Sequence, residues 1–145
     1  MPVSSASTRH PLVDPVFRAL FSLIFLVAGT GHLTNTAHIV SRLEKAALGH
    51  LATSVAPAEL LVLLSGVALL LGGTGLLLGY RTRWAALGLI AVLLPITITV
   101  QIGRPTLGPL FKNIALLGGL LFFAANGAGA YSLDARRTAV KHASA

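Results

Sequence analysis

The sequence predicts an all-α protein, an integral membrane four-helix bundle with an amphipathic segment between its first and second spans. Composition is the first reason: 54% of the 145 residues are hydrophobic and 10% are charged, against about 25% charged in a typical soluble domain. Pattern is the second reason, because four apolar stretches reach the length of about 20 residues that a helix needs to cross a bilayer. So small and apolar a chain cannot hide its hydrophobic surface in its own core, which excludes a soluble enzyme or a nucleic-acid binder.

The expected spans belong to one membrane domain, residues 15–134. It follows a leader, residues 1–14, that we expect to be disordered, and it precedes a basic cytoplasmic tail, residues 135–145. Basic, glycine and proline residues interrupt the apolar stretches at residues 80–83 and 103–109, as turns between helices require. The four expected spans are residues 16–33, 58–79, 84–102 and 110–129.

The first apolar stretch has a second interpretation, as a signal peptide. Arg9 and Arg18 precede an apolar run that ends in small residues, which is the pattern of a cleaved leader. The long polar lead and the three spans that follow favour a first span that is retained.

The basic residues predict the orientation. Four spans put both termini on one side, and seven of the eleven lysines and arginines fall on that side. The positive-inside rule therefore predicts a multi-pass protein of the cell inner (cytoplasmic) membrane with both termini in the cytoplasm. The net charge of +7 is scattered over loops and ends, which is typical of contact with the anionic lipid of a bilayer and not with nucleic acid.

Residues 33–56, between the first two spans, show a helical repeat. Ile39, Leu43, Ala47 and Leu51 recur every four residues, so they share one helical face. Such a segment predicts an amphipathic helix in the extracytoplasmic interface. The alternative is a lid folded over the bundle.

Small residues are expected to bring the helices together, because water does not drive helix association within lipid. The alternative is a glycine-lined pocket for a flat ligand. In the third span Pro95 predicts a kink, and the hydroxyls of Thr97 and Thr99 are suited to the carbonyls that it frees. The glycines expected in helix packing are Gly66, Gly72, Gly73, Gly75, Gly79, Gly118 and Gly119.

Five polar residues are expected to meet at the extracytoplasmic end of the bundle. His32 ends the first span, Glu59 begins the second, Gln101 ends the third, and Lys112 and Asn113 begin the fourth. Ionisable groups in a membrane are expensive, so this cluster is the candidate ligand-binding site. A structural network that clamps the helix ends is the alternative. In either case Glu59 can pair with Lys112, and Asn113 can hydrogen-bond across the bundle.

The remaining ionisable residues predict no catalytic or metal centre. The chain has no cysteine, which excludes disulfides, thiolate metal sites and CxxC redox chemistry. His32, His38 and His50 share one side, but no pair has a metal-binding spacing such as HExxH, so no metal or haem site is expected. Arg18, a few residues into the first span, is expected to extend its side chain to the cytoplasmic surface.

Three segments carry a resemblance to a known family. "FRALFSLIFLVAGTGHL", "AELLVLLSGVALLLGGTGLLLGYRTR" and "LFKNIALLGGLLFFAANGAGAYSLD" resemble the first, second and last helices of the DoxX family, and the resemblance runs over residues 17–134. It implies a four-helix integral membrane protein. Relatives include a subunit of thiosulfate:quinone oxidoreductase and membrane partners in actinobacterial complexes that link radical detoxification to thiol homeostasis. The residues that match by position are Arg18, Gly29, Glu59, Gly72, Gly73, Arg83, Lys112, Asn113, Gly118, Gly119 and Asp134.

The resemblance implies a membrane subunit or anchor of an oxidoreductase or redox-stress complex, with a protein partner and quinone as the possible cofactor. This function predicts a ligand-sized opening near the polar cluster. A non-enzymatic scaffold or assembly factor is the alternative, and it predicts a filled cluster and an exposed ridge of small residues. A small transporter is disfavoured because the centres of all four spans are uncharged. Some relatives carry an acidic residue deeper in the second helix; its absence here argues against direct redox or proton-relay chemistry.

Overall fold

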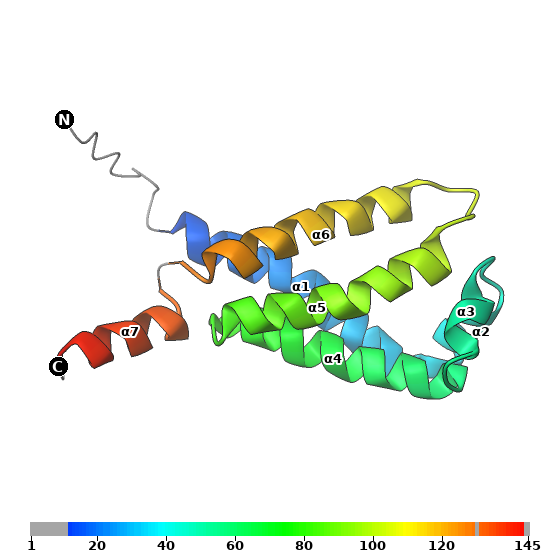
Figure 1. The fold of residues 1–145 in the computed structure, drawn as a ribbon, viewed down its shortest axis with the longest axis horizontal. Coiled ribbons are helices and arrows are strands. Elements are labelled where there is room, and N and C mark those ends of the chain that lie inside the picture. The colour runs from blue at the N-terminus through cyan, green and yellow to red at the C-terminus, as the bar shows by residue number, and fades with distance from the viewer. Residues whose placement is uncertain (1–11, 130, 144–145) are drawn as a thin grey trace.

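The computed structural model describes residues 12–129 and 131–143, and this part of the chain is helical throughout its regular structure (Figure 1). Four helical segments are long and apolar enough to cross a membrane: α1, α4, α5 with its extension η1, and α6. The predicted four-helix membrane fold is therefore confirmed. The elements are α1 Val13–Thr34, α2 Thr36–Glu44, α3 Gly49–Thr53, α4 Ala58–Leu78, α5 Thr82–Ile96, the π-helical η1 Thr97–Gln101, α6 Gly108–Asn126 and α7 Leu133–Ala143.

The surface of the bundle is apolar on its outer faces. Leu20, Val27, Leu71 and Leu121 are all exposed, although they stand in the middle of long helices. Water would oppose so much uncovered hydrocarbon, whereas lipid tails are a suitable solvent for it. The outer faces of the four long helices therefore fit a multi-pass membrane protein in contact with the bilayer.

The helices pack as a chain of neighbours in which α1 lies on α4, α4 on α5, and α5 on α6. Aromatic side chains connect α1 with α6 near the beginning of α1 and the end of α6. The Phe17 ring stacks on the Phe123 ring with centroids 5.3 Å apart, and Phe21 contacts the same ring at 5.5 Å. Towards their other ends α1 and α6 diverge (Figure 1), so the bundle is closed at one end and spread at the other.

Glycines permit the close approach of α4 to α1. A Cβ atom added at Gly66 would lie 2.9 Å from the Cβ of His32, and one at Gly73 would lie 3.2 Å from the Cβ of Phe25. Real Cβ atoms do not approach so closely without displacement, so a larger residue would push the two helices apart. Small residues at these positions let the two helix backbones approach each other closely, as is common between membrane helices.

The other expected packing glycines divide into two groups. Gly72 and Gly75 face Leu89 and Ala85 of α5, Gly119 faces Phe21 of α1, and Gly79 ends α4 with a positive φ of 63°. Gly118 differs, because a Cβ there would meet nothing within 4 Å. The structure therefore places six of the seven glycines in helix contacts or a turn and leaves Gly118 on an open face.

Arg18 is the main correction to the sequence interpretation. Its side chain does not extend to the surface, because only 4% of the residue is exposed. The guanidinium donates to the carbonyl oxygens of Ala128 at 2.8 Å, Tyr131 at 2.9 Å and Leu77 at 3.3 Å. Carbonyls at and beyond the C-terminal ends of α4 and α6 are electronegative, so they hold the cation inside the bundle.

Asp134 fastens α7 to the turn between α4 and α5. One carboxylate oxygen accepts from the backbone N–H of Arg81 at 2.8 Å, and the other accepts from the N–H and the hydroxyl of Thr82, both at 2.9 Å. Burial raises the pKa of this carboxyl, but the three hydrogen bonds and the charge of Arg137 outweigh it, so the pKa lies below its ordinary value. Asp134 thus caps the N-terminus of α5 from a distant part of the chain.

The segment between the first two spans forms two short helices, and these lie across the spread end of the bundle (Figure 1). Leu43 is buried, whereas Leu51 is largely exposed, so the expected apolar face does not continue through the segment. A turn after α2 interrupts it, with the N–H of Ala46 donating to the carbonyl of Leu43 at 3.1 Å. The contacts of α2 with α4 and of α3 with η1 correspond to the alternative of a cover over the bundle.

Candidate functional site

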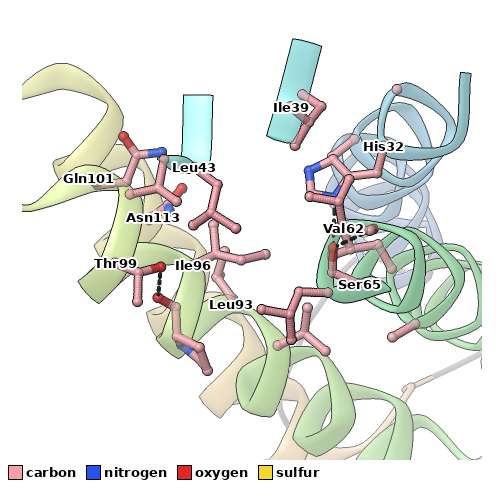
Figure 2. Close-up of a pocket in the computed structure, with 18 of the residues that line it drawn as sticks. His32, Ile39, Leu43, Val62, Ser65, Leu93, Ile96, Thr99, Gln101 and Asn113 are labelled. Atoms are coloured by element: carbon pink, nitrogen blue, oxygen red, sulfur yellow. Dashed lines mark hydrogen bonds between the residues drawn. The ribbon is translucent and has the colours of Figure 1, made fainter. Parts of the chain in front are cut away.

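A cavity of about 570 Å³ opens between the helices at the spread end of the bundle, beneath α2 and α3 (Figure 2). Its lining comes from α1, α4, α5, η1 and α6 and from the covering helices α2 and α3. Its deeper wall is apolar and includes Phe25, Leu69, Leu93 and Leu116. A few polar side chains interrupt that wall, which is the usual composition of a small-molecule site of this size.

His32 presents a hydrogen-bond acceptor to the cavity. Its Nδ1 lies 2.8 Å from the Ser65 hydroxyl, and that hydroxyl donates to the carbonyl of Val62 at 2.8 Å. In the tautomer that satisfies both bonds, the hydroxyl proton goes to Val62 and Nδ1 carries the proton of the neutral ring. The unprotonated Nε2 then points into the open space (Figure 2), where it can accept a hydrogen bond.

The wall opposite His32 is shaped by a π-helical turn. Pro95 has no N–H and cannot continue the α-helical ladder, and the next turn, η1, has π geometry. Thr97, Thr99 and Gln101 are all buried in η1, Thr97 against Asn113 of α6 and the other two at the cavity. Turns of this kind are frequent at functional sites, and this one adds Thr99 and Gln101 to the cavity lining.

The threonine hydroxyls of this turn bond to backbone carbonyls, although not to that of Ala91, whose α-helical donor is missing at Pro95. Thr97 donates to Leu93 at 2.6 Å, and Thr99 donates to Pro95 at 2.8 Å. Each hydroxyl proton therefore has an acceptor in its own helical segment, as a polar group in hydrocarbon requires, and the Leu93 oxygen also accepts from the Thr97 N–H. The Thr97 oxygen still has lone pairs, and these face α6.

Asn113 uses one of those lone pairs. The residue is only 3% exposed, and its Nδ2 donates to the Thr97 hydroxyl oxygen at 3.0 Å, which is the bond across the bundle that the sequence suggested. Among the described residues no protein donor bonds to its Oδ1, yet no enclosed side-chain oxygen or nitrogen lacks a partner. Oδ1 is therefore accessible, and Asn113 lines the cavity.

Gln101 and two cations complete the polar part of the lining. The Gln101 Oε1 accepts from Arg104 over a long 3.5 Å, and its amide nitrogen is turned towards the space between the walls (Figure 2). Lys112 of α6 and Arg42 of α2 also line the cavity, and both are exposed. The acceptor on α1 is His32. The other polar groups of the lining are the Gln101 amide on η1 and the two cations, Lys112 on α6 and Arg42 on α2.

Four of the five residues in the predicted cluster, His32, Gln101, Lys112 and Asn113, line this cavity, and Glu59 does not. The reason is rotation about α4, because Glu59 lies on the side opposite Leu61 and Ser65, which face the cavity. Glu59 is exposed, and in the described part of the chain no ion pair joins it to Lys112.

Sequence reasoning did not assign Ser65 or Arg42 to the site. A serine inside an apolar span was a usable signal, because a buried hydroxyl in lipid needs a partner and His32 is a strong one. Arg42 carried no such signal, since its place depends on how α2 folds back over the bundle. For a metal ion the structure offers no support within residues 12–129 and 131–143, where no three histidine, aspartate or glutamate side chains are grouped to bind one.

Four apolar spans around a lined cavity define the class: a multi-pass membrane protein with a candidate small-molecule site. The sequence model of the DoxX family matches residues 14–102, and the chain belongs to the DoxX family. The match ends at η1, so α6 with Lys112 and Asn113 lies outside it. Neither the curated proteins nor the solved structures include a significant match to this chain.

Proposed function

We propose that this DoxX-family protein is the membrane subunit or anchor of an oxidoreductase or redox-stress complex and binds a quinone in its cavity. The observation that carries the proposal is the composition of the cavity: apolar walls, an acceptor on one side and amide groups on the other. We place the protein in the cell inner membrane with both termini in the cytoplasm.

The lining fits the chemistry of a quinone head. Such a head is flat and apolar, and it carries oxygens at opposite ends of one ring. The Nε2 of His32 suits a hydroxyl of the reduced form, while the amide nitrogen of Gln101 suits a carbonyl of the oxidised form. We place the alkyl chain between the diverging ends of α1 and α6 (Figure 1), towards the surrounding lipid. The chain has no cysteine, so electrons would pass through a bound cofactor or a partner.

A binding measurement tests this proposal directly. The purified protein in lipid nanodiscs is titrated with a short-chain neutral benzoquinone, and the affinity is measured by calorimetry. The reduced quinol is titrated in the same way under anaerobic reducing conditions, because only this form has a hydroxyl that can donate to Nε2. His32→Ala should weaken binding of the quinol about tenfold, as expected for the loss of one well-placed hydrogen bond in an apolar site. His38→Ala is the matched control, because His38 is exposed on α2 and outside the lining. Equal affinity in both variants, or no binding by the wild type, would contradict a quinone site.

A non-enzymatic scaffold is the second candidate, and open glycines favour it. Nothing lies within 4 Å of a Cβ added at Gly88 of α5 or at Gly118 of α6. Such positions allow a helix of another membrane protein to approach closely. A mild-detergent pull-down with mass spectrometry would compare the wild type with Gly118→Leu. Loss of a stoichiometric partner with unchanged quinone affinity would favour the scaffold, and retention of a redox partner would favour the first proposal.

A further inference from the structure

We propose that the cavity selects lipophilic ligands that carry an anionic oxygen, in preference to neutral ligands of the same shape. This inference rests on the proposed ligand-binding role of the cavity and specifies the chemical class that it takes. The shared chemistry is an oxyanion on an apolar body. Two sources can supply it: a single-chain lipid carboxylate, or a quinone with an ionised ring hydroxyl.

The charge of the lining is the first argument. Arg42 and Lys112 are among the residues that line the cavity, and no aspartate or glutamate is among them. Glu44 and Glu59 lie at the same end of the molecule but outside the lining, and within the described residues neither forms an ion pair with either cation. The cavity therefore has two cations whose charge is not neutralised by a neighbouring carboxylate.

The position of Lys112 is the second argument. It is the fifth residue of α6, which begins at Gly108, and a helix N-terminus carries positive partial charge. A lysine there gains no stabilisation from its own helix. A bound anion, in contrast, is attracted both by the ammonium and by that end of the helix. The placement is unfavourable for the free protein and favourable for a complex with an anion.

The surroundings increase the attraction. Coulomb energies rise as the effective dielectric constant falls, and the cations border a cavity whose other walls are mostly aliphatic and aromatic. Gln101 adds an amide nitrogen on the same side as Asn113 (Figure 2), the residue that follows Lys112 in α6. Hydrogen bonds from charged donors to an oxyanion are about twice as strong as neutral ones. The ligand's head is thus expected at α2 and α6, with its apolar body against Phe25, Leu69 and Leu93.

The test uses matched pairs of probes in nanodiscs of zwitterionic phosphatidylcholine. Dodecanoate is compared with dodecanol, and a 3-alkyl-2-hydroxynaphthoquinone is compared with its neutral 2-methoxy analogue, at a pH where each acid is ionised. We expect at least one anion to bind about tenfold more tightly than its neutral partner, the effect of one charge-assisted hydrogen bond. Lys112→Gln and Arg42→Gln should each weaken binding of the anion more than binding of the neutral probe, and so reduce that preference.

Lys45→Gln is the control, because Lys45 is an exposed cation at the end of α2 that does not line the cavity. Circular dichroism melting establishes that each variant remains folded. Preference for dodecanoate alone supports the inference with a lipid as the source, and preference for the hydroxyquinone alone supports it with a quinone.

The failures of the two proposals are distinguishable. Equal affinity for anion and neutral partner, with the benzoquinone still bound, overturns the anion inference and leaves the proposed function standing. An anion preference that survives both glutamine substitutions also overturns it, because the cations would then not be the cause. Binding of dodecanoate with no binding of any quinone supports the inference and overturns the quinone function. If no probe binds, both proposals are overturned.

Discussion

The polar side chains at the two ends of the bundle differ in how they are hydrogen-bonded. At the closed end, formed around Arg18, Gly79 and Asp134, charged side chains bond to backbone groups of several elements. At the cavity end, formed around His32, Gln101 and Asn113, each side chain bonds to the protein on one side and is accessible on the other. Polar groups at the closed end therefore stabilise the fold, whereas those at the cavity end are available to a ligand.

The largest expected effect comes from Arg18→Met, which keeps much of the side-chain volume and removes the donors. Its loss would leave the carbonyls of Ala128, Tyr131 and Leu77 without their shared partner. We expect about 3 kcal/mol of lost stability, measured by denaturant titration in detergent. Arg42→Met, at the cavity end, should change stability by less than about 0.5 kcal/mol. Similar losses in both variants would remove the distinction between the two ends.

The next effect concerns the glycines that set the distance between helices. Gly66→Val should cost about 1–3 kcal/mol, the usual range for overpacking, because the added atoms would collide with His32 and Leu33. Gly118→Val is the control, since its face is open and removing a glycine from a helix is not costly. The measurement is thermal melting followed by circular dichroism. A loss at Gly118 as large as that at Gly66 would show that the face of Gly118 is packed in the folded protein and not open.

A third prediction uses the pH dependence of the closed end. Asp134→Ala removes the cap of α5 and should cost about 1 kcal/mol at neutral pH. Because the pKa of Asp134 is lowered in the folded protein, its stabilisation is complete above the unfolded pKa of about 4 and is lost as the pH falls through the folded pKa. Melting curves of the two proteins should therefore converge below about pH 4. A gap that does not narrow as the pH falls below about 4 would mean that the carboxylate charge is not the cause.

Much of the fold is predictable from the sequence, since a bilayer demands apolar stretches of a fixed length and turn residues separate them. The expected spans and the observed helices share their central residues, and they differ chiefly at the ends, where α1 begins at Val13 and α6 ends at Asn126. The covering segment was harder to predict. A repeat of every four residues predicts one continuous helix and says nothing of its orientation. The segment instead forms two helices, α2 and α3, separated by a turn that the repeat does not reveal.

The sequence predicted how deep in the membrane each residue of the candidate site lies, but not which way each side chain points. Counting residues along each span places His32, Gln101 and Asn113 at one level, and the structure brings them to one cavity. Counting residues does not give the rotation of each helix about its axis, and this rotation separates Glu59 from the others. Arg18 shows the same limit, because its partner carbonyl at Ala128 is 110 residues away in sequence.

The smallest expected effect concerns Glu59 and Lys112. If they formed a pair, Lys112→Ala would destabilise the bundle and a further Glu59→Ala would cost little more. The structure leaves both exposed and, within the described residues, without an ion pair between them. We therefore expect two losses below about 0.5 kcal/mol each that add in the double variant. A double variant that loses no more stability than Lys112→Ala alone, in detergent melting, would show that the two residues pair, and the cavity would then have only Arg42 as an uncompensated cation. Additive losses would instead leave Lys112 free to meet a ligand.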